Sequence, residues 1–285
     1  MSVDILQEKI RKTKCPILVD LSMDFMQLPE SVRQERTAAE ACYAYCSDLL
    51  TGLKDQVPGV RFDFNQWALL GEMDKLSDLM SQAQKLGYYV LLDAPSVLTA
   101  VQAQRAARLL DPHYGFECHG MIVNPYIGSD AVKAFLPYVQ EGKSVFFAVR
   151  TANKSAVELQ DMMTGSRLVH VAATDYVKRY GETAVGKCGY SHMGVLTACT
   201  NANAVLGLRN KYNRLFLLVD GLDQPGGNGK NCSYGFDRLG HGCAMSVGSA
   251  ITAAWMEAEG VDHVEAALQA VDRIRNNMNR YITIL

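Results

Sequence analysis

Polar side chains recur at or just after the ends of short apolar runs in this chain, and several of them can do acid–base or electrostatic chemistry. They are Asp20, Asp63 or Asn65, Asp93, Asn124, Arg150, Thr151, Thr197 and Asp220. A carboxylate can act as a general base, and an arginine can neutralise bound or developing negative charge. Any one of them could simply cap a helix or pair with a loop neighbour, but their repetition predicts a shared site.

The elements that would position these side chains alternate along the chain. Apolar, β-branched or aromatic runs indicate strands at 16–21, 60–65, 88–93, 121–124, 144–149, 193–197, 215–219 and 243–247. Helical spacing of apolar residues follows at 37–53, 71–86, 101–110, 131–141, 155–163, 168–180, 202–211 and from 251 onward. Continuously apolar strands separated by helices indicate a parallel sheet that is covered on both faces.

Eight such units favour one α/β domain over residues 1–285, a single (β/α)8 TIM barrel, over an open doubly wound sheet. In this fold the chemistry lies at the C-terminal ends of the strands, so we expect the strand-end side chains to meet at one mouth of the barrel. The seventh strand is followed by a long Gly-rich segment, 220–242, and segments of that kind are usually functional or disordered.

Composition excludes several classes of protein. Lys and Arg number 28 against 30 Asp and Glu, a balance that argues against binding to nucleic acid or to a membrane surface. The charged N-terminal segment does not resemble a secretion signal, and we find no spanning apolar run, so we expect a cytoplasmic protein with eight reduced cysteines. Cys232, His241 and Cys243 match no standard metal spacing, so no metal and no cofactor is expected.

Several segments together resemble the orotidine 5′-phosphate decarboxylase family, especially its longer-chain bacterial branch. These segments are 18–29, 123–130, 146–161, 220–227 and 247–251, and they occur in the family's order over nearly the whole chain. The specific ones are the fourth-strand motif Val-Asn-Pro-Tyr-Ile-Gly-Ser-Asp and the fifth-strand motif Ala-Val-Arg-Thr-Ala-Asn. The resemblance implies a barrel that binds a nucleotide, forms a homodimer and places Asp20 against a ribose.

The departures from the family pattern concern its chemistry. The family uses alternating lysines and aspartates centred on a third-strand motif Asp-x-Lys-x-x-Asp. Here that segment reads Asp-Ala-Pro-Ser-Val-Leu, so Asp93 is kept, Pro95 stands at the lysine position and Leu98 at the second aspartate. Arg61 stands at the position of the second-strand lysine. Proline offers no proton, and arginine, with a pKa above about 12, is a poor general acid, so lysine-dependent decarboxylation should be lost.

The expected ligand pocket departs as well. Ala152 stands where the family has a serine that contacts the pyrimidine, and Ser249 stands where it has an arginine that grips phosphate. Lys230 or Arg238, from the long segment, could replace that positive charge. The resemblance and the Gly-rich loop together give Asn124, Thr151, Gln224, Gly226, Gly227, Gly248 and Ser249 as candidate ligand-binding residues, the glycines through their backbone N–H groups.

Three functions are compatible with these residues. The first is a divergent family member that binds a phosphorylated or nucleotide-like small molecule and catalyses a different reaction, with Asp20, Arg61 and Asp93 as its polar centre and Asp93 as its base. The second is a non-catalytic nucleotide-sensing or regulatory protein. The third is a decarboxylase of pyrimidine biosynthesis whose missing groups come from the long segment or from a partner subunit.

Overall fold

The computed structural model describes residues 2–284, and eight parallel strands among them close into one barrel. Around the barrel the order is β1, β10, β9, β8, β5, β4, β3, β2 and back to β1. The strands are β1 (Ile17–Asp20), β2 (Gly59–Asp63), β3 (Tyr89–Asp93), β4 (Gly120–Val123), β5 (Ser144–Arg150), β8 (Ser191–Ala198), β9 (Leu215–Asp220) and β10 (Cys243–Val247). The expectation of a single (β/α)8 TIM barrel is therefore confirmed.

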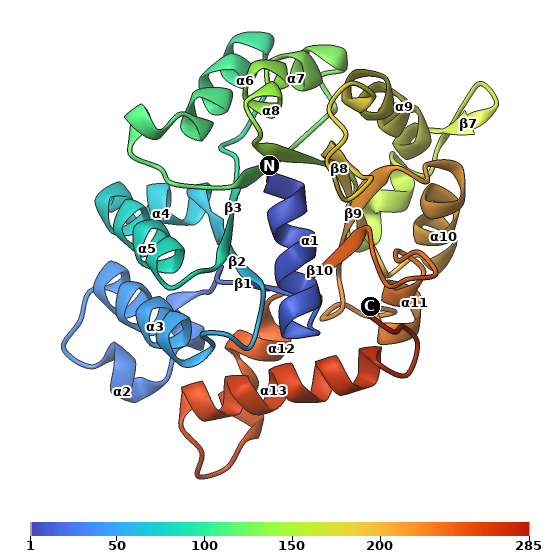
Figure 1. The fold of residues 1–285 in the computed structure, drawn as a ribbon. Coiled ribbons are helices and arrows are strands. Elements are labelled where there is room, and N and C mark those ends of the chain that lie inside the picture. Colours follow the sequence, from blue (N-terminus) through green and yellow to red (C-terminus); the bar gives the residue numbers. More distant parts are fainter. Residues whose placement is uncertain (1, 285) are drawn as a thin grey trace.

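Helices surround the barrel on its outer side (Figure 1). They are α2 (Glu30–Arg33), α3 (Ala38–Gly52), α4 (Phe64–Leu70), α5 (Met73–Lys85), α6 (Ala100–Ala107), α7 (Ser129–Lys133), α8 (Leu136–Gln140), α9 (Val169–Gly181), α10 (Ala202–Lys211), α11 (Gly229–Ser233), α12 (Ser249–Thr252) and α13 (His263–Met278). Local signals fix where several of them begin. Thr37 and Glu40 form a reciprocal capping box at α3, and Thr99 caps α6.

Alternation along each strand sorts side chains between two cores. Val19, Val60 and Phe62 face outward and pack under the helices, whereas Leu18 and Leu91 face the barrel interior. Because successive strand residues point to opposite faces, the inward positions continue toward the C-terminal end of each strand. The interior is apolar at the level of Leu18, and it becomes polar one step further along the strands.

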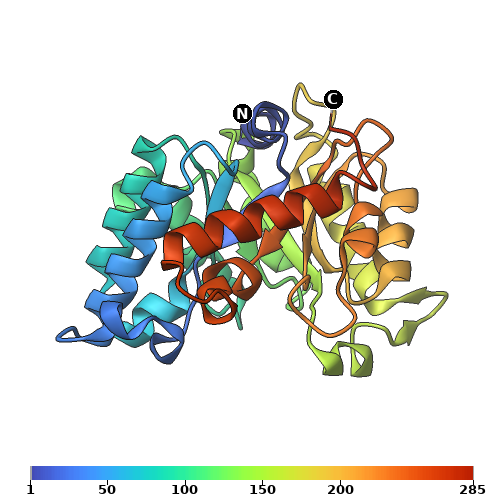
Figure 2. The same cartoon turned by 90° about the horizontal axis from the view of Figure 1, so that it is seen from below.

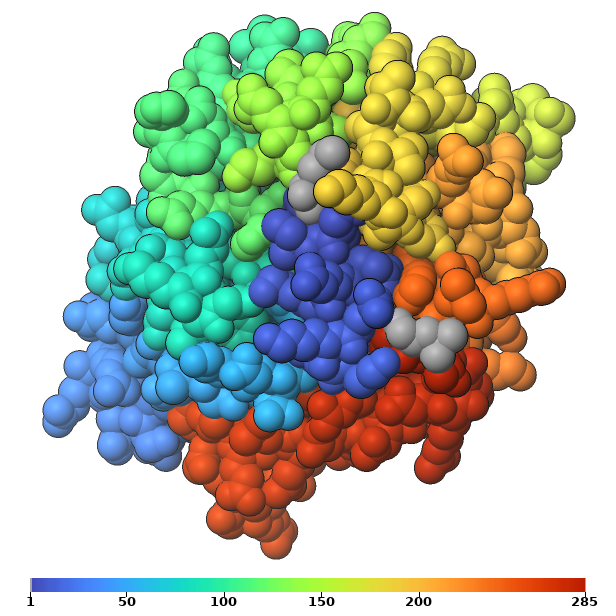
Figure 3. Space-filling view, viewed as in Figure 1, coloured from blue at the N-terminus to red at the C-terminus, as the bar shows by residue number. Residues whose placement is uncertain are grey.

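A helix that was not predicted from the sequence closes the end of the barrel where the strands begin. Helix α1 (Ser2–Thr13) lies across this end in Figure 1, and its atoms cover the middle of the same face in the space-filling view of Figure 3. Val3, Leu6 and Ile10 are fully buried in the interior core. Figure 2 shows α1 at the far edge of the barrel, away from the strands' C-terminal ends. This end of the barrel is therefore sealed, and the C-terminal mouth is left for chemistry.

The expected helix boundaries are wrong in three places. The helix expected at 71–86 begins only at Met73, because Gly71 adopts a left-handed conformation, with φ of 71°, and ends the preceding helix α4. The helix expected at 131–141 is split into α7 and α8, with Pro137 in the first turn of the second. The helix expected at 155–163 is only a 3-10 turn, Lys154–Glu158, and an antiparallel pair of short strands, β6 (Met163–Thr164) and β7 (Arg167–Leu168), follows it.

The long segment 220–242 is ordered and contains α11. The buried guanidinium of Arg209 holds it through the carbonyl oxygens of Gly235 at 2.8 Å and Gly242 at 2.6 Å, and it also donates to the carbonyl of Leu215 on β9 at 3.0 Å. Cys232 of α11 packs in the outer core. Within the described part of the chain, no helix is both long enough and apolar enough to cross a bilayer.

Candidate functional site

One arginine stands at the centre of the barrel mouth. Arg61 lies on β2 between two outward-facing residues, Val60 and Phe62, so its side chain points inward. The same alternation places Asp20 above Leu18 and Asp93 above Leu91. Strand pairing sets Asp20 level with Arg61 across β1 and β2. Asp93 pairs with Asp63, two residues beyond Arg61 on β2, so Arg61 reaches toward the strand end to contact it. The sequence named these three residues as a polar centre, and the structure brings them together.

The guanidinium of Arg61 contacts three carboxylates and one hydroxyl. Its Nε lies 2.8 Å from Oδ1 of Asp93, and its Nη2 lies 2.5 Å from Oδ2 of the same side chain. Its Nη1 lies 3.0 Å from Oδ2 of Asp20, 3.4 Å from Oδ2 of Asp220 and 2.9 Å from the Oγ of Ser246. A two-point contact of this kind fixes the guanidinium plane, so Arg61 is held rigidly.

The charges in this cluster do not balance, because three carboxylates face one guanidinium. The Arg61 side chain is only 12% exposed, and those of Asp20 and Asp93 are 17% and 20% exposed. Burial raises the pKa of Asp93 to about 6, although Arg61 opposes that rise and Asp20 adds to it. Burial raises the pKa of Asp220 as well. For Arg61, burial alone would lower the pKa, but the neighbouring carboxylates hold it well above its ordinary value.

The second oxygen of two of these carboxylates also has donors within the protein. Oδ1 of Asp20 accepts hydrogen bonds from the Ser22 hydroxyl at 2.6 Å and the Ser22 backbone at 3.0 Å. Oδ1 of Asp220 accepts from the backbone N–H of Gly221 at 2.6 Å. Both oxygens of Asp93 contact Arg61. Asp93, which the sequence favoured as a base, therefore has one N–H of Arg61 on each oxygen.

The third-strand segment places no amino group near Asp93. Pro95 is partly buried just beyond β3, and the Leu98 side chain is 73% exposed. Among the described residues, no lysine forms an ion pair with Asp20, Asp93 or Asp220. The cation that these three carboxylates contact is Arg61, whose guanidinium stays protonated near neutral pH.

Other strand-end residues have structural partners instead. The side chain of Asn124 caps its own turn by accepting from the Tyr126 N–H at 2.9 Å, and Thr151 exchanges hydrogen bonds with Gln160. Arg150 is bound to Asp161 by two contacts of 3.0 and 3.1 Å. Thr197 shares the outward face of Val195, so it points away from the mouth. These four do not join the Arg61 cluster.

The Gly-rich loop after β9 is also engaged with itself. The N–H of Gly227 donates to the carbonyl of Gln224 at 2.9 Å, so it is not free to cradle an anion. The Gly248 N–H donates to Oδ2 of Asp223 at 3.0 Å, and the Ser249 hydroxyl donates to the same oxygen at 3.2 Å. Sequence reasoning missed Asp223, because an acid within a Gly-rich loop carries no signal of its contacts.

The two cations proposed from the long segment differ in position. Arg238 follows Asp237, whose carboxylate accepts from Tyr190 just before β8 begins. This is the end of the barrel opposite to Asp20, so Arg238 does not supply the missing charge. Lys230 lies exposed on α11 and makes no ion pair among the described residues. Its role stays a prediction.

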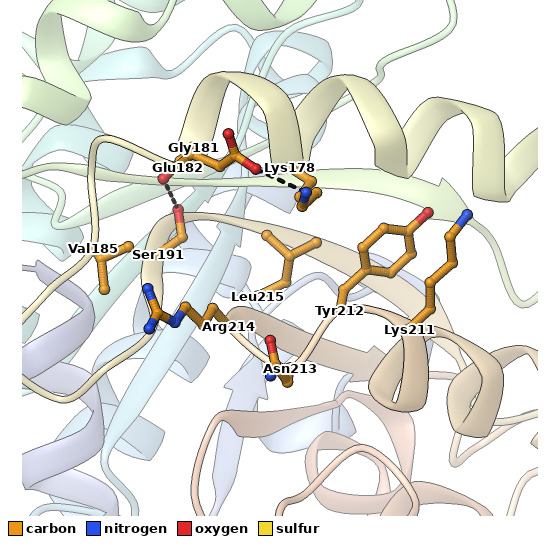
Figure 4. A pocket seen from close by; sticks show the side chains of 10 residues that line it. All are labelled: Lys178, Gly181, Glu182, Val185, Ser191, Lys211, Tyr212, Asn213, Arg214 and Leu215. Carbon is orange, nitrogen blue, oxygen red and sulfur yellow. Dashed lines mark hydrogen bonds and ion pairs between the residues drawn. The ribbon is translucent and has the colours of Figure 1, made fainter.

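Two hollows border the barrel at opposite ends. One, of about 460 Å³, lies beside the mouth between the segments that follow β1 and β2, and Asp24, Asp63 and Gln66 help to line it. The other, of about 290 Å³, is drawn in Figure 4 and lies where β8 and β9 begin, at Ser191 and Leu215. In (β/α)8 barrels the N-terminal end of the strands, where the hollow of Figure 4 lies, serves stability. The acidic hollow at the C-terminal end is therefore the one that extends the candidate site.

The mouth offers no ready metal site. Within residues 2–284, no group of three or more His, Cys, Asp or Glu side chains has an arrangement that could hold a metal ion. Arg61 instead occupies the centre that a cation between Asp20, Asp93 and Asp220 would need. All eight cysteines are free thiols, and Cys188 alone among them is partly exposed. The side chains at the mouth are therefore suited to hydrogen bonding and charge pairing.

Comparison with known proteins gives a consistent assignment. No family model matches the chain. The chain is 27% identical to orotidine 5′-phosphate decarboxylase of Clostridium kluyveri, over 98% of this chain and 97% of that protein. It is 24% identical to the enzyme of the same name from Clostridium acetobutylicum, over 98% of this chain and 99% of that one.

Solved structures show the same barrel. OMP decarboxylase of Leishmania donovani superposes with a TM-score of 0.74 at 22% identity, covering 96% of this chain and 99% of that chain. Orotidine 5′-monophosphate decarboxylase of Plasmodium berghei does so with a TM-score of 0.76 at 11% identity, covering 98% and 97%. Similarity over nearly the full length in sequence, together with the shared fold, places the protein: the chain belongs to the orotidine 5′-phosphate decarboxylase superfamily.

Proposed function

We propose that this protein binds a nucleotide-like small molecule at the barrel mouth and does not carry out lysine-dependent decarboxylation. The observation that carries the proposal is the Arg61 cluster. Asp20, Asp93 and Asp220 converge on a guanidinium, in a superfamily whose chemistry, by the resemblance, uses alternating lysines and aspartates. A guanidinium that stays protonated and makes two hydrogen bonds to Asp93 can position a ligand, but it cannot deliver a proton to a carbanion.

The shape and polarity of the mouth support ligand binding. The other end of the barrel is sealed by α1, whereas the mouth combines a rigid charged centre with an adjoining acidic hollow. Asp20 presents a carboxylate at the edge of that centre, held in place by Ser22. Preorganised polar groups at the open end of a closed apolar barrel are typical of small-molecule sites.

If the bound protein also turns a ligand over, Asp93 is the candidate base. Its pKa of about 6 lies near neutrality, which suits a group that exchanges protons at physiological pH. A regulatory protein that only senses the ligand would keep the same contacts without turnover. The homodimer and the cytoplasmic location expected from the sequence stay predictions.

A second candidate function is orotidine 5′-phosphate decarboxylase itself. The observation that favours it is the full-length similarity to relatives of that name, at 24–27% identity. This function requires a proton donor from outside the described mouth, such as a lysine of a second copy of the chain.

Turnover and binding measured side by side separate the candidates. Purified protein is incubated with orotidine 5′-monophosphate labelled in the carboxylate, and released CO2 is counted. Thermal shifts are recorded in parallel with that compound, UMP and uridine. We expect stabilisation by at least one of the three ligands without CO2 release above the buffer control.

A matched pair of variants locates the binding. Asp20→Asn should abolish the thermal shift, whereas Asp272→Asn, at an exposed position of α13, should leave it unchanged. CO2 release that scales with protein concentration would establish the second candidate function instead. The absence of any shift with all three compounds would contradict the proposed binding function.

A further inference from the structure

A buried histidine lies in the outer ring of helices and takes no part in the Arg61 cluster. His170 belongs to the first turn of α9, and its side chain is only 3% exposed. Its Nδ1 lies 2.9 Å from the carbonyl oxygen of Gln160 and 3.2 Å from Oδ1 of Asp161. Hydrogen bonds from Arg150 hold the pKa of Asp161 below its ordinary value although burial opposes them, so both neighbours of Nδ1 are acceptors. Nδ1 therefore carries a proton.

The position of this proton makes the other ring nitrogen an acceptor. Burial lowers the pKa of His170, although Gln160 and Asp161 oppose that shift, so the imidazole is neutral near pH 7. A neutral imidazole with its proton on Nδ1 has a lone pair on Nε2. Within residues 2–284 no donor reaches this nitrogen, and unlike Nε2 of His192 it is not shut off from solvent. Nε2 of His170 can therefore accept a hydrogen bond from a bound molecule.

A cavity of about 190 Å³ adjoins His170, between helices α9 and α10. These two helices are neighbours in the outer ring (Figure 1). The cavity has apolar walls from Leu168, Val171 and Leu208, and His170 contributes a buried acceptor. A cavity of about 150 Å³ is large enough to hold benzene. The space beside His170 can therefore take a molecule with a single six-membered ring.

A glycine inside α10 leaves room at this cavity. Gly207 lines it, within a ten-residue helix where glycine is the least favourable residue after proline. The backbone there is helical, so its conformation does not require glycine. A methyl group built on Gly207 would meet no atom within 4 Å, so a side chain at this position would extend into open space. The sequence thus leaves empty a position that most residues would fill.

We propose that this cavity is a binding site for a small molecule of the phenol class, whose hydroxyl donates to Nε2 of His170 while its ring packs between α9 and α10. The inference goes beyond the proposed function and does not depend on it, because His170 and Gly207 lie outside the Arg61 cluster. The lone pair on Nε2 requires a donor, which excludes a simple anion. The apolar walls favour a ring over a polar sugar.

Calorimetric titration with phenol, benzene and acetate tests the chemistry of the occupant. At neutral pH, wild-type protein should bind phenol saturably, with a Kd on the order of 1 mM. It should bind benzene roughly 3- to 10-fold more weakly, because benzene has no donor for Nε2. Acetate is an anion without a donor at this pH, and we expect no binding.

Two variants locate the binding. His170→Asn keeps a donor for the Gln160 carbonyl and removes the acceptor, so it should bind phenol no more tightly than benzene. Gly207→Leu fills the cavity with a side chain and should abolish the binding of both compounds. Asn210→Leu adds the same side chain at an exposed position of α10, so this matched control should keep the wild-type affinities. Circular dichroism confirms that each variant is folded.

Every result bears on the proposal. Loss of all binding in Gly207→Leu, together with loss of the preference for phenol in His170→Asn, would support it. It would be overturned if wild type showed no saturable binding of phenol, bound benzene or acetate as tightly as phenol, or bound phenol no better than Gly207→Leu does. Since Gly207→Leu leaves His170 intact, the test stands even if His170→Asn does not fold.

Discussion

Replacing Arg61 by alanine should destabilise the protein strongly at neutral pH and less so in acid. The substitution removes the cation that contacts Asp20, Asp93 and Asp220, in a cluster where the arginine side chain is 12% exposed. Removing one partner of a buried ion pair costs about 3–5 kcal/mol, because the other charge is left uncompensated. We expect a loss of that size in the free energy of unfolding at pH 7.5.

Protonation limits this loss and gives it a pH dependence. Without Arg61, the folded variant gains stability by binding protons on the clustered carboxylates, and Asp93 already has a raised pKa of about 6 in the wild type. Since the folded variant binds more protons than the folded wild type, its deficit shrinks as the pH falls, by about 1.4 kcal/mol per pH unit for each extra proton bound. At pH 5.0 the deficit should be only about 1–3 kcal/mol.

Urea unfolding followed by circular dichroism at pH 7.5 and 5.0 measures both values. Arg209→Ala is the matched control, because Arg209 is equally buried but its partners are carbonyl oxygens, which do not titrate in this range. Its deficit should be the same at both pH values. An Arg61→Ala protein within about 1 kcal/mol of wild type at pH 7.5, or one with an equal deficit at both pH values, would show that Arg61 does not stabilise the fold by pairing with these carboxylates.

Three further outcomes follow from single residues. Burial raises the pKa of Asp93 to about 6, so this residue should favour the folded state more as the pH falls from 7 to 4. Over that interval, the free energy of unfolding of wild type, measured in urea, should rise relative to that of Asp93→Asn by about 1–3 kcal/mol. A difference that does not change with pH would contradict the raised pKa. Leu6→Ala in α1 should cost about 2–5 kcal/mol, because Leu6 is fully buried in the interior core, and a melting temperature equal to that of wild type would show that α1 does not seal the barrel. Brief iodoacetamide treatment of the folded protein, followed by peptide mass spectrometry, should label Cys188 before any other cysteine, because Cys188 alone is partly exposed. Burial raises the pKa of its thiol to about 11, so the reaction should be slow. Preferential labelling of a buried thiol would contradict the described packing.

The barrel could be predicted from the sequence because its strands are short, apolar and regularly spaced. The mouth cluster could be predicted in part for the same reason, since a strand that ends in Asp93 must present that residue where its neighbours end. Alternation also explains the failure at Thr197. Moving one residue along a strand moves the side chain from the inner face to the outer face. Thr197 lies on the outer face, and its sequence neighbourhood did not indicate which face it would occupy.

The contacts that define the site's charge could not be predicted. The bond between Arg61 and Asp220 joins residues 159 positions apart, and the donors to Asp223 come from a turn about 25 residues further along. Nothing local in a Gly-rich loop distinguishes an acid that faces solvent from one that folds back onto a neighbouring turn. Such partners are set by the closure of the barrel.

The sealing helix α1 also constrains the order in which the molecule can assemble. The N–H of Ser2 donates to the carbonyl of Gly142, and the N–H of Val3 donates to His192 at 3.3 Å. On a ribosome, α1 is synthesised before β5 and β8, and it must therefore wait for both strands before it finds its place. An amphipathic segment left undocked for that long is exposed to proteases and chaperones, and its final docking would mark the completion of the barrel.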